Sequence, residues 1–309
     1  MNLTLPDGLR ARLHLPTLPA LPARLGPVVD RLPGWLPGRS SGPVVVPDRL
    51  SIFDPVDLGA DEYGARVSVM LAYRNLLIGG EPGGGKSNGI QSILGHAALC
   101  PDVRLYLFDG KEVELPMWEP LAEWFVGPDT DEAIAVLEML RSEMTACYAR
   151  LRGQAVRKVD VTTGGGMALV VIDELALYSS TFGTGEQQKQ FNRLLRDLIA
   201  RGRAAGVIVV AATQRPSADV IPTSLRDLFA FRWALRCSTA AASDIILGES
   251  WASQGFTATD IDPADSGRGI GYLLAEGGIP RRFKAARLTD ADIAVLVAAG
   301  LTLRSGGAR

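Results

Sequence analysis

The sequence predicts an α/β protein with a mostly parallel central sheet that is covered by helices on both faces. Short, continuous Val/Ile/Leu runs alternate with longer segments of helical periodicity, which is typical of a parallel sheet buried on both sides. The apolar run 75–78 leads through a glycine-rich loop into a helical segment. With 309 residues, 47% of them hydrophobic, the chain is long enough for one large domain or two small ones with an ordinary core.

The expected elements follow one another from about residue 50. A hairpin comes first, because apolar runs at 56–58 and 67–71 flank a polar, glycine-containing turn. Further strands are predicted at 75–78, 103–108, 168–172, 206–211, 229–235 and 270–275. Helices are predicted at 86–98, 131–151, 187–202 and 240–247, with a short one at 290–299. The second helix has three candidate caps, Asp129, Thr130 and Asp131.

Residues 80 to 87 read Gly-Glu-Pro-Gly-Gly-Gly-Lys-Ser and match the phosphate-loop pattern G-x-x-x-x-G-K-[ST]. Glycines let the backbone form a nest of N–H groups around a phosphate, and a helix N-terminus favours the anion. We expect Lys86 to reach the β- and γ-phosphates of ATP and the Ser87 hydroxyl to hold Mg²⁺. A chance glycine-rich turn is the alternative, and the flanking strand and helix disfavour it. The predicted nucleotide-binding residues are Gly80, Glu81, Pro82, Gly83, Gly84, Gly85, Lys86, Ser87 and Asn88.

Two acids follow the apolar run 168–172, in a Walker B pattern. We expect Asp173 to hold the Mg²⁺ shell, directly or through water, and Glu174 to polarise the attacking water. An ordinary pair of surface acids is the alternative. The next strand ends in Ala-Thr-Gln-Arg-Pro, where Gln214 is suited to sense the γ-phosphate or orient water, or simply caps a turn.

The net charge of −2 means that any contact with nucleic acid must come from a local patch or from a surface made by assembly. Cys100, Cys147 and Cys237 lack metal-ligand spacing, and we interpret them as reduced core thiols of a cytoplasmic protein. Residues 1–48 hold nine of the 19 prolines and are mildly basic. This arm is either a flexible tail or a docking arm for a membrane surface or an accessory protein.

Several segments resemble the motor domain of the FtsK/SpoIIIE DNA translocases. A phosphate loop alone is unspecific, whereas Arg201-Gly-Arg-Ala-Ala-Gly206 followed by Ala212-Thr-Gln-Arg-Pro-Ser217 is much more specific. The resemblance covers most of the chain, from about residue 50 to about 288. The other matching segments are Phe108-Asp-Gly-Lys111 with Glu114-Leu115, Val171-Ile-Asp-Glu174, Asp219-Val-Ile221, Phe231-Arg-Trp-Ala234 and Asp244-Ile-Ile-Leu-Gly248.

The resemblance implies a RecA-like P-loop ATPase domain over residues 49–288 that assembles as a ring, expected to be a hexamer, around double-stranded DNA. It also implies that a neighbour's arginine completes each nucleotide site. Arg203 and Arg232 match arginines of the family, with a salt bridge or a DNA contact as the alternative. Lys111 and Glu114 match a further stretch of the family, whose role at the subunit interface is not defined.

DNA contacts are expected from loops that would line the pore. The candidates are 153–166, with Arg157 and Lys158, and 177–189, with Lys189. Plain solvated loops are the alternative.

The chain departs from full-length FtsK-like proteins, because neither N-terminal membrane helices nor a C-terminal winged helix is evident, and 289–309 is expected to be a short helical tail. The layout resembles conjugative-transfer proteins more closely. The competing hypotheses are a type VII secretion-like ATPase that moves proteins and a nucleotide-binding assembly protein with vestigial hydrolysis. An intact Lys86, Asp173 and Glu174 argue against the latter.

Overall fold

A computed structural model describes residue 46 and residues 49–160 and 166–306. Apart from Val46, the proline-rich arm 1–48 lies outside the described residues, as do residues 161–165 of the predicted DNA-contacting loop. Among the described residues, no helix is both long and apolar enough to span a bilayer.

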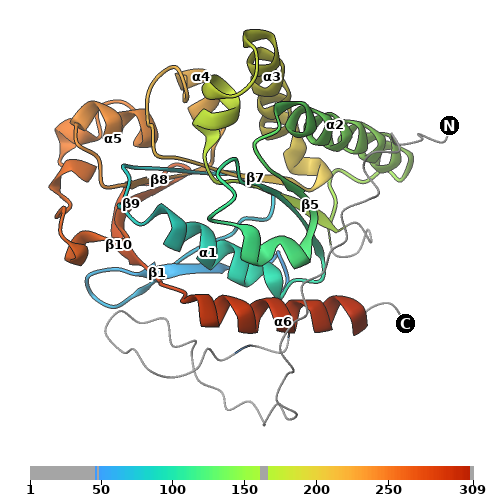
Figure 1. Cartoon of the computed structure of the whole chain (residues 1–309), viewed down its shortest axis with the longest axis horizontal. Helices are drawn as coiled ribbons and strands as arrows, with labels where there is room; N and C mark the ends of the chain where they lie inside the picture. Colours follow the sequence, from blue (N-terminus) through green and yellow to red (C-terminus); the bar gives the residue numbers. More distant parts are fainter. Residues whose placement is uncertain (1–45, 47–48, 161–165, 307–309) are drawn as a thin grey trace. The chain divides into compact units, whose positions relative to one another are not determined.

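The described residues form a sheet in the order β2-β1-β10-β9-β8-β3-β7-β6-β4-β5. Figure 1 shows this sheet with helices around it. The strands from β8 to β5 run parallel, whereas β9, β10, β1 and β2 join them as an antiparallel extension. The strands are β1 Val56–Ala60, β2 Arg66–Val69, β3 Leu76–Gly79, β4 Val103–Phe108, β5 Ala122–Val126, β6 Met167–Ile172, β7 Val207–Thr213, β8 Phe231–Leu235, β9 Ile270–Ala275 and β10 Arg281–Ala285.

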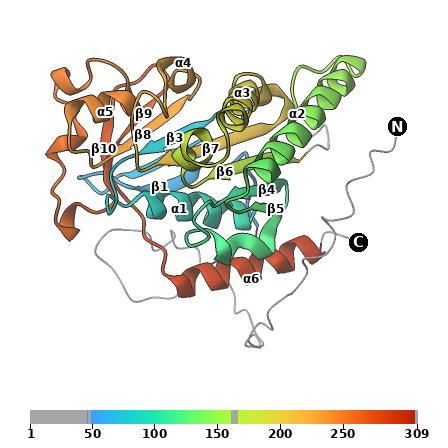
Figure 2. The same ribbon diagram turned by 45° about the horizontal axis from the view of Figure 1, so that its top comes forward.

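Helices cover both faces of this sheet, as predicted, with α1 and α6 on one side and α2 and α3 on the other (Figure 2). Strand β6 shows why both faces must be covered. Leu169 and Val171 are buried in one core, and Val170 and Ile172 are buried in the other, because successive side chains of a strand point to opposite faces. The helices are α1 Lys86–Ala98, α2 Thr130–Gly153, α3 Gly185–Arg201, α4 Thr223–Arg226, α5 Ala240–Leu247 and α6 Asp290–Gly306.

Helix capping resolves one open prediction. Asp129 is the cap of α2, since its carboxylate accepts hydrogen bonds from the backbone N–H groups of Asp131 (2.9 Å) and Glu132 (3.1 Å). Helix α3 begins with a capping box between Thr184 and Gln187.

Two strands were not predicted from the sequence. Strand β10 carries three basic residues among five, and only Phe283 and Ala285 on it are buried, so it lacks the continuous apolar run of the parallel strands. Strand β5 follows directly on a 3₁₀ turn, Pro116–Leu121, whose prolines obscure the start of the strand. In both cases pairing with a neighbouring strand, and not local pattern, decides the structure.

The interpretation of 177–189 as one loop is wrong. A π-helical turn occupies Leu177–Thr181, and α3 has already begun at Gly185. Lys189 therefore lies on a helix, where it pairs with Glu186 at 2.9 Å. At the other end of the chain, the predicted C-terminal helix extends to Gly306 as α6, and Ile293, Leu296 and Val297 bury it in the same core as α1.

Candidate functional site

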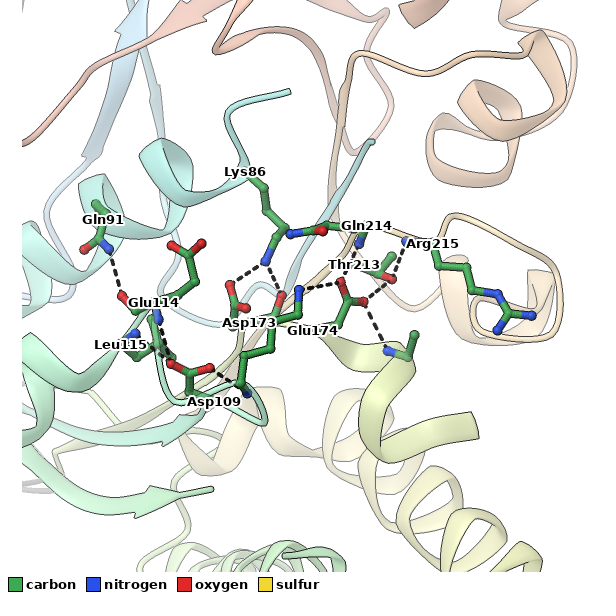
Figure 3. Close-up of polar contacts among 12 residues, drawn as sticks. Lys86, Gln91, Asp109, Glu114, Leu115, Asp173, Glu174, Thr213, Gln214 and Arg215 are labelled. Carbon is green, nitrogen blue, oxygen red and sulfur yellow. Dashed lines mark hydrogen bonds and ion pairs between the residues drawn. The ribbon is translucent and has the colours of Figure 1, made fainter. Parts of the chain in front are cut away.

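The loops at the carboxyl ends of the parallel strands meet at one edge of the sheet. Gly79 at the end of β3 pairs with Thr213 of β7, and Phe108 of β4 pairs with Ile172 of β6, so these strands end at matching levels. The segment after β3 is the glycine-rich loop, and the segment after β6 begins with the two predicted acids. Ligands of open α/β sheets bind at this carboxyl edge. Figure 3 shows the polar side chains that gather there.

The glycine-rich loop leads into α1 through Gly85, which caps the helix with a φ of 99°. A Cβ atom at this position would lie 2.5 Å from the backbone N of Gly269, so only glycine fits. The N-terminus of α1 has no side-chain cap and no acid in its first turn. This helix N-terminus and its dipole are therefore available to an anion such as a phosphate.

Arg236 contacts the first residues of the glycine-rich loop, and it was not predicted from the sequence to be part of the site. Its carbonyl accepts a hydrogen bond from the N–H of Glu81 (2.8 Å), and its guanidinium pairs with the Glu81 carboxylate (3.1 Å). The same guanidinium donates to the carbonyl of Pro82 (3.3 Å). The residue directly follows β8, a neighbour of β3 in the sheet, and that adjacency is visible only in the folded chain.

Lys86 and Asp173 form a buried pair. The ammonium donates to the Asp173 carboxylate and to its main-chain carbonyl (2.6 Å), and the side chains of the two residues are 3% and 0% exposed. Burial raises the pKa of Asp173, and the charge of Lys86 partly offsets this effect. The second carboxylate oxygen of Asp173 is buried without a hydrogen-bond partner among the described residues. A buried acceptor that lacks a partner fits a magnesium ion or its water shell.

Glu174 is held between two elements. Its Oε1 accepts a hydrogen bond from the Thr213 hydroxyl (2.6 Å), and its Oε2 accepts one from the backbone N–H of Gln214 (2.8 Å). The Lys111 ammonium lies 3.9 Å from Oε2. Gln214 therefore meets the acid through its main chain. Thr213 was not singled out from the sequence, although it ends the buried strand next to Walker B.

The two arginines that were candidates for action in trans, Arg203 and Arg232, do not lie among the side chains at the carboxyl edge. Arg203 comes just before β7, at the amino edge of the sheet, where its Nε donates to the carbonyl of Tyr73 (2.7 Å) and its side chain is 47% exposed. Arg232 lies within β8, opposite Leu77. Burial and the neighbouring Arg226 lower the pKa of Arg232, and its Nε has no hydrogen-bond partner among the described residues. Arg203 is thus on the edge opposite to Lys86. Both arginines form an ion pair, the alternative given above, Arg203 with Glu276 (4.0 Å) and Arg232 with Asp227 (3.7 Å).

The described part of the predicted DNA-contacting loop is also at the amino edge. Arg157 is exposed, and the ammonium of Lys158 lies 4.0 Å from the ring centre of Tyr73. Arg152, Arg157 and Arg201 line a shallow cavity of about 450 Å³ beside this loop. The surface there is locally basic although the whole chain is slightly acidic.

A strand, a glycine-rich loop and a helix, with Lys86 facing an acid pair, define a P-loop protein with a RecA-like fold. The sequence profile of the FtsK/SpoIIIE family matches residues 51–249, and the chain belongs to this family. The DNA translocase FtsK of Treponema pallidum (strain Nichols) is 30% identical over 264 residues, which cover 79% of this chain and 31% of that protein.

The fold is found in other solved structures. The pCW3 conjugation coupling protein TcpA, in its monomer form with ATPγS, gives a TM-score of 0.69 at 22% identity and covers 84% of this chain and 75% of that one. The cytoplasmic domain of the Thermomonospora curvata type VII secretion ATPase EccC gives 0.63 at 19%, over 81% of this chain and 31% of that one. The chain spans about a third of the length of the curated relatives that it matches.

Proposed function

We propose that this chain hydrolyses ATP and uses the energy to move double-stranded DNA, as one subunit of a ring. The observation that carries the proposal is the buried assembly of Lys86, Asp173 and Glu174 at the uncapped N-terminus of α1. Membership of the FtsK/SpoIIIE family supports DNA as the substrate. Transfer between cells is the process that we favour, because the chain shares its fold with a conjugation coupling protein.

Each residue of the site has a part in hydrolysis. The phosphates of ATP would bind at the N-terminus of α1, and Lys86 would leave Asp173 to contact them. Ser87 and Asp173 would hold Mg²⁺, which supplies positive charge to the transferred phosphoryl group. Glu174 would orient the attacking water and draw its proton. We expect ATP hydrolysis to take place in the cytoplasm or at the cytoplasmic face of the membrane. Cell fractionation that finds the protein in any other compartment would contradict this expectation.

The test is steady-state ATP turnover by the purified protein with Mg²⁺, measured with and without linear double-stranded DNA. We expect DNA to stimulate turnover. Stimulation by a secretion-signal peptide in place of DNA would favour the type VII kind of ATPase. An assembled protein without nucleotide affinity would rule out both functions.

Arg203→Ala should leave ATP binding intact and lower DNA-stimulated turnover about 1,000-fold, because an arginine supplied in trans stabilises the charge of the transferred phosphoryl group. Its place at the amino edge, opposite to Lys86, supports this role. Mixing this variant with a Lys86→Ala variant should restore part of the activity in mixed rings. Arg232→Ala is the comparison variant. If Arg232→Ala loses turnover and Arg203→Ala does not, Arg232 is the arginine that acts in trans.

Replacing both Arg157 and Lys158 with glutamate should weaken DNA affinity and flatten its dependence on salt. With fewer phosphate contacts, fewer counterions are released from the DNA when the protein binds. Basal ATP turnover should stay the same, since this segment contacts Tyr73 and Ala204 at the amino edge of the sheet, opposite to Lys86. Affinity would be measured by fluorescence anisotropy between about 50 and 200 mM salt. The matched control replaces Arg193 and Arg196, two exposed arginines of α3, with glutamate and so makes the same change of charge. An unchanged slope in the Arg157/Lys158 double variant would remove this loop from the DNA path.

A further inference from the structure

The segment Phe108-Asp-Gly-Lys111, with Glu114 and Leu115 beyond it, has no role in the proposed function so far. It follows β4 at the carboxyl edge and lies beside the two Walker B acids. Its geometry, together with that of Thr213, bears on how Glu174 is oriented.

Asp109 folds this segment into a fixed turn. The side chain is fully buried, and its two oxygens accept hydrogen bonds from four backbone N–H groups. The segment includes Glu112, whose φ of 55° places it in the left-handed region that non-glycine residues rarely adopt. A carboxylate that accepts several N–H groups can hold such a backbone in place. The four donors are Lys111 (3.1 Å), Glu112 (3.0 Å), Glu114 (2.9 Å) and Leu115 (2.9 Å).

This turn brings Lys111 to Glu174. The ammonium lies 3.9 Å from Oε2, which is the distance of an ion pair rather than of a hydrogen bond. From the other side, the hydroxyl of Thr213 donates to Oε1 of Glu174 at 2.6 Å, the short distance typical of an O–H donor to a charged acceptor. Thr213 is completely buried and Glu174 is 5% exposed, so water does not compete for this contact.

We propose that Thr213 and Lys111 are positioning residues that fix the orientation of the Glu174 carboxylate for its action on water. A glutamate has three rotatable bonds, and a water-orienting group is effective only when it is held close to the reactive geometry. Thr213 supplies the directional contact, and Lys111 supplies an attractive charge on the opposite side. The inference rests on the proposed ATP hydrolysis.

The experiment compares Thr213→Val, which keeps the side-chain shape but removes the hydroxyl, with Thr213→Ser, which keeps the hydroxyl. We expect Thr213→Val to lower kcat about tenfold, a part of the effect of a full general base, with KM for ATP changed less than about twofold. Thr213→Ser should keep most of the activity. Binding of an ATP analogue reports folding, and it should be the same in all variants.

Lys111→Met removes the ammonium and retains the length of the side chain. It should lower kcat about threefold without changing KM, a smaller loss than for Thr213→Val because the ion pair is partly exposed. Lys284→Met, which removes a lysine of β10 whose ammonium donates to the carbonyl of Ser266 (3.1 Å), is the matched control and should have no effect.

The decisive arm repeats these changes in a Glu174→Gln background, where residues that act through Glu174 should cause no further loss of single-turnover rate. An equal further loss in that background, or a Thr213→Ser variant as slow as Thr213→Val, overturns the role of Thr213. A raised KM for ATP in Lys111→Met overturns the role of Lys111. If the unaltered protein with Mg²⁺ and DNA does not turn over ATP, the proposed function itself fails.

Discussion

Replacing Lys86 with alanine should abolish ATP binding and lower DNA-stimulated turnover by at least about 100-fold, the scale of losing one charge-stabilising donor. Lys86 is the cation at the uncapped N-terminus of α1, so no other described residue of the phosphate loop replaces its charge. ATP binding would be measured by calorimetry with a non-hydrolysable analogue, and turnover by phosphate release.

The same change has a cost in stability that depends on pH. Without Lys86, the buried Asp173 carboxylate loses its counter-charge, and removal of one partner of a buried pair costs about 3 kcal/mol. Burial raises the pKa of Asp173 in the folded protein, so its neutral form is favoured by folding. The destabilisation should therefore diminish as the pH falls from neutrality through the folded-state pKa and grow as the pH rises.

Asp173→Asn in the Lys86→Ala background separates these two effects. The double variant should recover the free energy of unfolding, measured by urea denaturation, because the buried carboxylate that lost its counter-charge is replaced by a neutral amide. Its ATP turnover should stay lost. A Lys86→Ala protein that keeps parental turnover would show that phosphate is not bound here.

Replacing Glu174 with glutamine should preserve ATP binding and lower turnover by about 100-fold or more, the contribution typical of a general base. The amide oxygen of glutamine can still accept from the Gln214 N–H or from the Thr213 hydroxyl, so the site should keep its shape. Single-turnover hydrolysis together with retention of bound ATP would measure the two effects separately.

The matched control is Glu186→Gln, an exposed acid on α3 that pairs with Lys189, which should leave both measurements unchanged. Hydrolysis at the parental rate in Glu174→Gln would show that another group orients the water.

The local pattern of apolar and polar residues was sufficient to predict much of the fold. The run that became β6 is apolar at every position because both of its faces are covered, and this signature is present in the sequence itself. Strand β10 has no such signature, since one of its faces meets solvent and its charged residues resemble a loop. The segment 177–189 misled for the opposite reason, because Ser, Thr and Gly suggest a loop where a π-helical turn and a capped helix are found.

The candidate functional site also has a part that local sequence patterns predict and a part that they do not. Gly80–Ser87 and Asp173–Glu174 could be predicted as site residues because each motif lies in one short stretch. Arg236 and Thr213 were missed, because neither belongs to a local pattern of its own. Their contacts with Glu81 and Glu174 join residues more than 30 positions apart.

The sequence by itself determined the phosphate loop, the acid pair and the sheet with two covered faces, because each depends on residue types at fixed short spacings. Only the tertiary structure decided that Lys86 meets Asp173, that Glu174 turns toward Thr213, and that Arg203 lies at the opposite edge. These relations follow from strand order and register, which depend on how distant apolar faces pack together. A spacing within one stretch of chain carries no information about them.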